Sequence, residues 1–176
     1  MKKIELRLLK YMAALVTAVM ALTMVSCGSD DDETAYLEVG KTDYVEVEYS
    51  VDLSEAWYRF YDISVSYTGR DGVIRYENFE ADRDVKFRVD YDVAPRDMQF
   101  TVIASPKAES PQIDDDRDVI FDQNCSIKVK GYTFANQRTM LDYLHRDPDR
   151  YIVAPGNMSR QLEQDLVLFT ATCRLD

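Results

Sequence analysis

The chain has 176 residues, a formal net charge of −11 at pH 7 and a single histidine, His145. This length allows one domain of ordinary size, and an apolar fraction of 46% supplies a core and argues against a wholly disordered chain. One histidine excludes a site built on two imidazoles, and three cysteines cannot all be paired within one chain.

The first 26 residues have the pattern of a secretory signal peptide. Lys2, Lys3, Arg7 and Lys10 give the chain a basic start, and the stretch 11–24 is uncharged and mostly Ala, Leu, Val and Met. A basic start followed by a short apolar stretch is typical of an exported protein, and it fits a signal better than a helix that spans a bilayer. A retained N-terminal anchor helix is the alternative interpretation.

This segment ends in the tetrapeptide Met24-Val25-Ser26-Cys27. The tetrapeptide resembles the lipobox of bacterial lipoproteins, in which an apolar residue and two small residues precede a cysteine. Met24 departs mildly from the pattern, because leucine is usual at its position. The resemblance implies that a diacylglyceryl group is attached to the sulfur of Cys27 and that residues 1–26 are removed.

An acidic run, Gly-Ser-Asp-Asp-Asp-Glu at 28–33, follows the cysteine. It resembles the export signal beside the lipidated cysteine of Bacteroidota lipoproteins, which implies an outer-membrane lipoprotein that faces the cell exterior. The alternative is a periplasm-facing lipoprotein in which 27–34 is only a solvated tether. The resemblance covers residues 2–33 and implies nothing about the function of the rest.

Removal of residues 1–26 makes the chain more acidic. The removed segment holds four basic residues and one acidic residue, so the net charge goes from −11 to −14. A protein of this charge repels nucleic acid and anionic lipid headgroups, which argues against both as partners. Cationic peptides, divalent cations or solubility alone stay open as reasons for the charge.

The remaining residues, 35–176, are predicted to form one domain of short strands. Seven segments alternate apolar and polar residues with a period of two, which is typical of strands with one buried face. They are 44–51, 61–67, 73–79, 85–91, 100–104, 125–130 and 166–173. The pattern predicts a mainly β fold, an antiparallel β-sandwich of seven or eight strands, either immunoglobulin-like or transthyretin-like. Because 166–173 is apolar on both faces, we expect it at the centre of a sheet.

One short helical insertion is expected near 133–147. Phe134, Leu141 and Leu144 recur at helical spacing, Thr133 is suited to the N-cap, and Pro148 would end the helix.

With Cys27 assigned to lipid, Cys125 and Cys173 are left. An even number of cysteines in an oxidising compartment predicts one disulfide. Closing a loop of about 48 residues would stabilise the domain by about 4 kcal/mol. Two buried free thiols are the alternative.

Aromatic residues are densest at Trp57, Tyr58, Phe60 and Tyr61. Exposed aromatic side chains stack on sugar rings, so Trp57, Tyr58 and Tyr61 are candidates for a ligand platform. Core packing is the alternative, because strands commonly bury aromatic side chains.

An acidic loop carries Asp114, Asp116 and Asp118 at alternate positions, where their oxygens could bind calcium. The EF-hand pattern fails, because Val119 stands where the motif needs glycine and Cys125 where it needs glutamate. A calcium loop of another kind and a solvated acidic loop both stay open, and no other cofactor is indicated.

The sequence indicates no catalytic constellation. His145 lies beside Arg146 near the expected helix end, and neither a nucleophile nor a third partner is evident for it. We therefore expect a lipid-anchored, non-catalytic cell-surface binding or accessory module whose partner is a glycan, a peptide or an outer-membrane protein. A structural or adhesion-assembly subunit is the first alternative, and a small hydrolase that uses carboxylates or calcium is the second.

Overall fold

A computed structural model divides the chain into two compact units, Met1–Asp32 and Glu33–Asp176. The residues that the structure describes all belong to the second unit; they are 34–37, 42–109, 111–113, 116–135, 139–154 and 156–176. The expected signal peptide, Cys27, the acidic run 28–33 and Asp114 lie outside the described residues.

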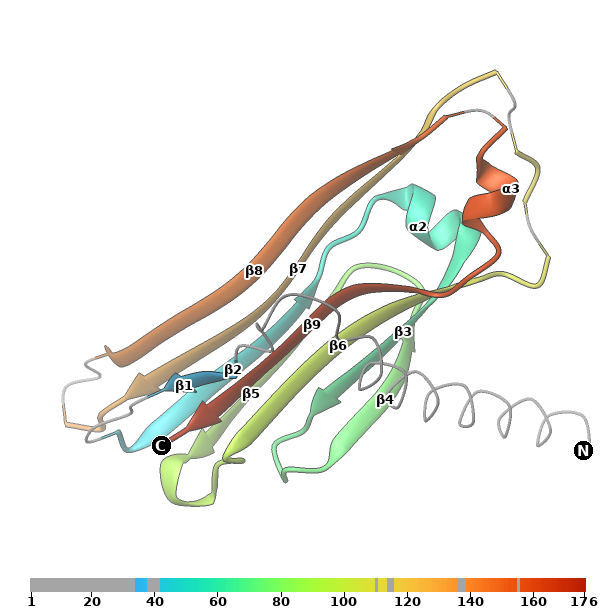
Figure 1. Cartoon of the computed structure of the whole chain (residues 1–176). Coiled ribbons are helices and arrows are strands. Elements are labelled where there is room, and N and C mark those ends of the chain that lie inside the picture. The colour runs from blue at the N-terminus through green and yellow to red at the C-terminus, as the bar shows by residue number, and fades with distance from the viewer. Residues whose placement is uncertain (1–33, 38–41, 110, 114–115, 136–138, 155) are drawn as a thin grey trace, which may run out of the picture. The chain divides into compact units, whose positions relative to one another are not determined.

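Within the described residues, nine strands form the two sheets of a β-sandwich (Figure 1). The five-stranded sheet has the order β1 (Ala35–Leu37), β9 (Leu166–Leu175), β6 (Asp97–Pro106), β3 (Tyr61–Thr68), β4 (Ile74–Phe79). The four-stranded sheet has the order β5 (Arg83–Asp90), β2 (Tyr44–Val51), β7 (Val119–Tyr132), β8 (Thr139–Val153). The short helices are α2 (Glu55–Phe60), η1 (Tyr91–Val93) and α3 (Met158–Gln161). The prediction of a mainly β sandwich is confirmed, with one parallel pair, β1 and β9.

Strand β2 illustrates how the predicted alternation builds the core. Val45, Val47, Tyr49 and Val51 are each no more than 1% exposed, and the intervening polar residues lie on the outer face. The Tyr49 ring lies 5.1 Å from the ring of Phe100 in the opposite sheet. Burying a large apolar side chain contributes about 1.5–3 kcal/mol, so this regular pattern is sufficient to fix which face of the strand points inward. All seven predicted segments are strands.

The prediction of a helix near 133–147 is wrong, because most of this segment lies in strand β8. The strand pairs antiparallel with β7, from the pair of Val119 with Val153 to the pair of Tyr132 with Thr139. Phe134 and Leu144 are 62% and 55% exposed, so the helical spacing of apolar residues does not correspond to a buried stripe. Long-range pairing with β7 supplies the backbone hydrogen bonds that an isolated helix would have made locally.

Pro148 stands in the middle of β8 instead of ending an element. It pairs with Asn124, whose N–H donates to the carbonyl of Asp52 at 2.8 Å on the other side of β7. The Asn124–Pro148 pair therefore exchanges no backbone hydrogen bonds. The backbone nitrogen of Pro148, which carries no hydrogen, faces the outer edge of the sheet. The proline therefore removes no hydrogen bond between β7 and β8.

Strand β9 is central over only part of its length. It pairs with β6 along the strand, but β1 covers only Cys173–Leu175. A register shift opposite Val102 and Ile103 turns both Leu168 and Phe169 toward the core, where they are 4% and 3% exposed. This bulge explains why the sequence is apolar on both faces there.

The structure contains no disulfide between Cys125 and Cys173, which are both buried free thiols. Cys125 lies on β7 and Cys173 lies on β9, in opposite sheets. The two cysteines are thus free thiols at two buried positions, and burial raises the pKa of both thiols to about 12.

A thiol assay on a Cys27→Ser variant checks this arrangement. We expect Cys125 and Cys173 to be unreactive toward a thiol reagent at pH 8 in the folded protein, since the thiolate is the reactive form. Both should react after unfolding in guanidinium without a reductant. Unfolded protein treated with reductant is the control, and release of thiols only in that control would show that the two cysteines are bonded.

Candidate functional site

The three residues of the expected ligand platform are not gathered on the surface. Trp57 and Tyr61 are 2% and 1% exposed, and the Trp57 ring lies 4.7 Å from the ring of Phe121. Tyr58 is half-buried, and its hydroxyl donates to Asp82 at 2.8 Å. Burial and this hydrogen bond raise the pKa of Tyr58. The aromatic cluster thus packs α2 onto the sandwich, as expected if these aromatic side chains belong to the core.

The acidic residues of the expected calcium loop are only partly described. Asp116 and Asp118 are exposed, whereas Asp114 lies outside the described residues. In the part of the chain that the structure describes, no group of three or more His, Cys, Asp or Glu is placed to hold a metal ion. The calcium loop stays a prediction.

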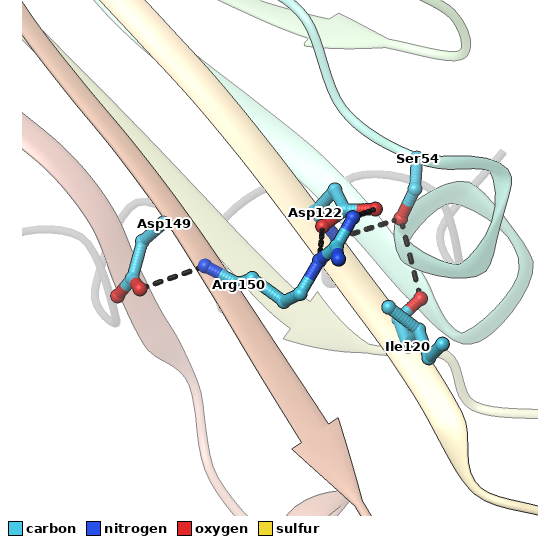
Figure 2. Close-up of polar contacts among 5 residues, drawn as sticks. All are labelled: Ser54, Ile120, Asp122, Asp149 and Arg150. Atoms are coloured by element: carbon cyan, nitrogen blue, oxygen red, sulfur yellow. Dashed lines mark hydrogen bonds and ion pairs between the residues drawn. The ribbon is translucent and has the colours of Figure 1, made fainter.

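The carboxylate of Asp122 links β7 to β8 through Arg150, while that of Asp149 hydrogen-bonds within β8 (Figure 2). Arg150 donates to Asp122 through Nε and through Nη2, the latter at 3.1 Å. This hydrogen bonding lowers the pKa of Asp122. The Asp122 N–H donates to the Ser54 hydroxyl at 3.0 Å, and Asp149 accepts the backbone N–H of Arg150 at 2.7 Å. These contacts fix the second half of β8 to its neighbours.

The inner face of β8 is only partly covered by the opposite sheet. On the inner face of β7, Cys125 and Ile127 are 0% exposed, but the residues paired with them on β8, Asp147 and His145, are exposed. The opposite sheet ends in β1, which has only three residues. We call the region between the inner face of β8 and the edge of β9 over Leu166–Thr172, which no other described strand pairs with on that side, the open side.

Aromatic contacts connect the two borders of the open side. The His145 ring on β8 lies 5.4 Å from the ring of Phe169 on β9, so the expected helix-end position of His145 is replaced by a strand position. Farther along β8, the Tyr151 ring meets the Trp57 ring edge to face at 6.1 Å. Hydrogen bonding to Asp149, together with burial, raises the pKa of Tyr151 to about 12.

One polar side chain at the open side is buried and incompletely bonded. Gln123 on β7 is 4% exposed, and its Nε2 donates to the backbone carbonyl of Leu168 at 2.9 Å. Its Oε1 has no hydrogen-bond partner among the described residues. A buried acceptor without a donor costs about 1–3 kcal/mol, so this position is suited to an incoming N–H group.

The outer face of the four-stranded sheet carries an open hollow of about 500 Å³. Four cations and two glutamates line it: Lys86, Arg88, Lys128, Lys130, Glu46 and Glu48. Lys86 lies 3.1 Å from Glu48, and the Arg88 guanidinium lies 3.4 Å above the ring centre of Tyr44. Lys130 is also in an ion pair, with Asp142 at 3.2 Å.

Comparison with known protein families, curated proteins and solved structures finds no match for this chain. Across the described ranges, no helix is both long enough and apolar enough to cross a membrane. Lipid attachment at Cys27 and an outer-membrane location stay predictions.

Sequence reasoning missed the residues that define the open side. In the sequence Gln123 and Asp147 are ordinary polar residues, because the face of the sheet that each one occupies depends on the partner strands. The available signal is the doubly apolar stretch 166–173, which contains the bulge in β9 but predicts a central strand.

Proposed function

We propose that this protein is a lipid-anchored, non-catalytic cell-surface module that binds a partner protein at its open side. The observation that supports this function is the edge of β9 over Leu166–Thr172, beside which no strand lies among the described residues, beneath the exposed inner face of β8. Strand edges with unpaired backbone groups are sites at which another chain can add. The anchor and the surface location come from the resemblance of residues 2–33 to Bacteroidota lipoproteins.

The proposal assigns no catalytic role to His145. Its ring packs on Phe169, and the nearby carboxylates Asp147 and Asp149 lie on the same face of β8. This arrangement offers an acidic surface with an apolar floor, which suits binding of a cationic segment.

An assembly subunit is the second candidate, favoured by the same uncovered edge. If the added strand comes from another copy of the chain, repeated addition would build a polymer. The two candidates therefore differ in the identity of the partner and not in the surface used.

Photo-crosslinking in intact cells tests the function. We expect benzoylphenylalanine at Asp147 to form an adduct with one defined protein, because this position borders the open side. The control places the same group at Tyr76, which is 62% exposed on β4 at the far edge of the five-stranded sheet. An adduct with a second copy of this chain would support the assembly subunit instead, and the lack of any adduct specific to Asp147 would contradict both candidates.

The anchor is checked in the same cells with a Cys27→Ser variant. Lipid attachment predicts that wild type incorporates a labelled fatty acid and that the variant does not. Equal labelling of the variant and of wild type would contradict the lipid anchor.

A further inference from the structure

Strand β4 forms the edge of the five-stranded sheet that lies farthest from β1 (Figure 1). It pairs antiparallel with β3, and no other described strand pairs with it. The chain enters this sheet at β1, and the four strand spacings between β1 and β4 amount to about 19 Å. The backbone along β4 is therefore exposed at an edge that does not adjoin the entry of the chain.

The backbone groups of Ile74, Tyr76 and Asn78 point toward this edge. The N–H of Gly69 donates to the carbonyl of Val73 at 2.8 Å, and these two residues lie opposite each other directly beyond the last pair of the β3–β4 register. The register is regular, so the odd-numbered residues of β4 exchange hydrogen bonds with β3. The even-numbered residues direct their N–H and C=O groups away from β3, toward a strand that would be added.

Large apolar side chains are exposed along the same edge. Tyr76 and Ile74, on the outer face of β4, are 62% and 40% exposed, and Val73, just before the strand, is 57% exposed. Edge strands are commonly protected from pairing by proline or by being very short, and β4 has six residues and no proline. A strand added here would cover part of this apolar surface and satisfy the backbone groups.

The sequence of β4 is complementary to itself. When two copies of an edge strand pair antiparallel, the residues whose backbone groups face the edge must lie opposite each other. Pairing centred on Tyr76 meets this condition and places Arg75 of each copy opposite Glu77 of the other. The neighbouring registers, centred on Arg75 or on Glu77, would place that residue opposite its own equivalent, and like charges directly opposite each other are destabilising. The charges therefore select the register centred on Tyr76.

The two charged residues stay accessible in the single chain. The Arg75 side chain is 51% exposed and lies 2.7 Å from Asp71. The Glu77 side chain is 33% exposed and lies 2.9 Å from Arg83. Exposed ion pairs of this kind contribute little to stability, so both groups can turn toward a second copy at small cost.

We propose that two copies of this chain associate by antiparallel pairing of β4 over residues 74–78, with Tyr76 at the twofold axis. The pairing joins the two five-stranded sheets into one continuous sheet, and it is closed, because each copy uses the same edge. It lies at the edge of the sheet opposite to β1, so it is independent of the proposed function and goes beyond it.

Disulfide crosslinking in intact cells that display the full-length protein tests the pairing. Cys125 and Cys173 are buried, and lipid is expected on Cys27, so a Tyr76→Cys variant adds the reactive thiol. The Cα atoms of a hydrogen-bonded antiparallel pair lie about 5.5 Å apart, within the range of a disulfide. After mild oxidation we expect at least tenfold more disulfide-linked dimer than for Tyr36→Cys, a control at a side chain that is 64% exposed on β1. Equal amounts of dimer, or none at Tyr76→Cys, would overturn the proposal.

A second crosslink tests the register with Tyr76 intact. Ile74→Cys and Asn78→Cys on separate copies in the same cell should form a disulfide, because these positions lie opposite each other. Either variant alone should give no dimer, since each position is about 14 Å along the strand from its own equivalent. Dimers of the single variants in the same yield as the mixed pair would contradict the pairing centred on Tyr76.

A charge reversal tests the contact between Arg75 and Glu77. Arg75→Glu should lower the yield of the mixed crosslink severalfold, and addition of Glu77→Arg should restore it. The matched control is Arg70→Glu in the exposed turn before β4, which should leave the yield unchanged. Glu77 also accepts a hydrogen bond from the Tyr67 hydroxyl, so the double variant is not needed for the decision if it fails to fold. Equal effects of Arg75→Glu and Arg70→Glu would contradict the proposal.

Other occupants of this edge give a different product. A disulfide between Tyr76→Cys and another protein would assign the edge to a partner and overturn the pairing of two copies. In the photo-crosslinking experiment, we expect benzoylphenylalanine at Tyr76 to capture a second copy of the chain while Asp147 captures a different protein. An Asp147 adduct without any Tyr76 dimer would remove the β4 pairing and leave the proposed function standing.

Discussion

Replacing Trp57 with alanine is expected to lower the free energy of unfolding by about 3–5 kcal/mol. Trp57 is 2% exposed, and its ring contacts those of Phe121 at 4.7 Å and Tyr61 at 5.3 Å, so truncation leaves a cavity where α2 meets the sandwich. Urea unfolding followed by circular dichroism measures the loss.

Two control variants accompany this measurement. Trp57→Phe keeps most of the aromatic packing and should cost less than Trp57→Ala, particularly because the indole Nε1 has no hydrogen-bond partner among the described residues to lose. Tyr36→Ala, at a side chain that is 64% exposed, should change stability by less than about 0.5 kcal/mol. A loss below about 1 kcal/mol for Trp57→Ala would mean that the side chain lies outside the core and would return it to the list of ligand-binding candidates.

Raising the pH from 9 to 12 is expected to destabilise the protein through its two buried thiols. The folded state raises the pKa of Cys125 and Cys173 from 9.0 to about 12 by burial, so between these values the unfolded state binds fewer protons than the folded state. Stability is therefore fully present below pH 9 and falls as the pH rises, by about 1.4 kcal/mol per unit for each thiol. Each thiol accounts for a loss on the order of 4 kcal/mol at pH 12.

Guanidinium unfolding at pH 8, 9, 10 and 11 in the presence of a reductant measures this slope. Burial and hydrogen bonding to Glu77 also raise the pKa of Tyr67 to about 12, so a residual slope will appear above pH 10. Cys125→Ala and Cys173→Ala should each remove about 1.4 kcal/mol per pH unit between pH 9 and 11. A slope that neither variant changes would show that the thiols do not ionise on unfolding.

The strands with one wet face could be predicted because their local pattern and their final environment agree. Val45, Val47, Tyr49 and Val51 alternate with polar residues, and the faces they imply are the faces that the sheets bury. A shift of one residue would expose all four, so the pattern alone specifies the register.

Strand β8 could not be predicted in this way because it lies at an edge. Its burial pattern is almost entirely exposed, so period-two alternation carries little energy and the helical spacing of Leu141 and Leu144 gave a competing signal. Pro148 also favours the wrong prediction, because a proline commonly ends a helix. A proline is tolerated in an edge strand, and only the order of the strands shows that β8 lies at an edge.

The candidate site depended on strand order still more strongly. The aromatic cluster at Trp57, Tyr58 and Tyr61 is compatible in sequence with a surface platform or with core packing, and packing against Phe121 places two of its members in the core. The open side depends on the short length of β1 and on pairing between segments far apart in the chain. The local sequence around Gln123 gives no sign that its side chain is buried and incompletely bonded.

The order of residues alone gives the net charge, the expectation of export from the first 33 residues, and the seven strands in which buried and exposed residues alternate. These features are local, since each depends on the order of residues within one short segment. The pairing of distant segments makes 139–153 a strand, places Cys125 and Cys173 in opposite sheets, and leaves Leu166–Thr172 of β9 with a strand on one side only among the described residues. Those features depend on which segments pair, because the backbone hydrogen bonds and the facing side chains of a sheet come from other parts of the chain.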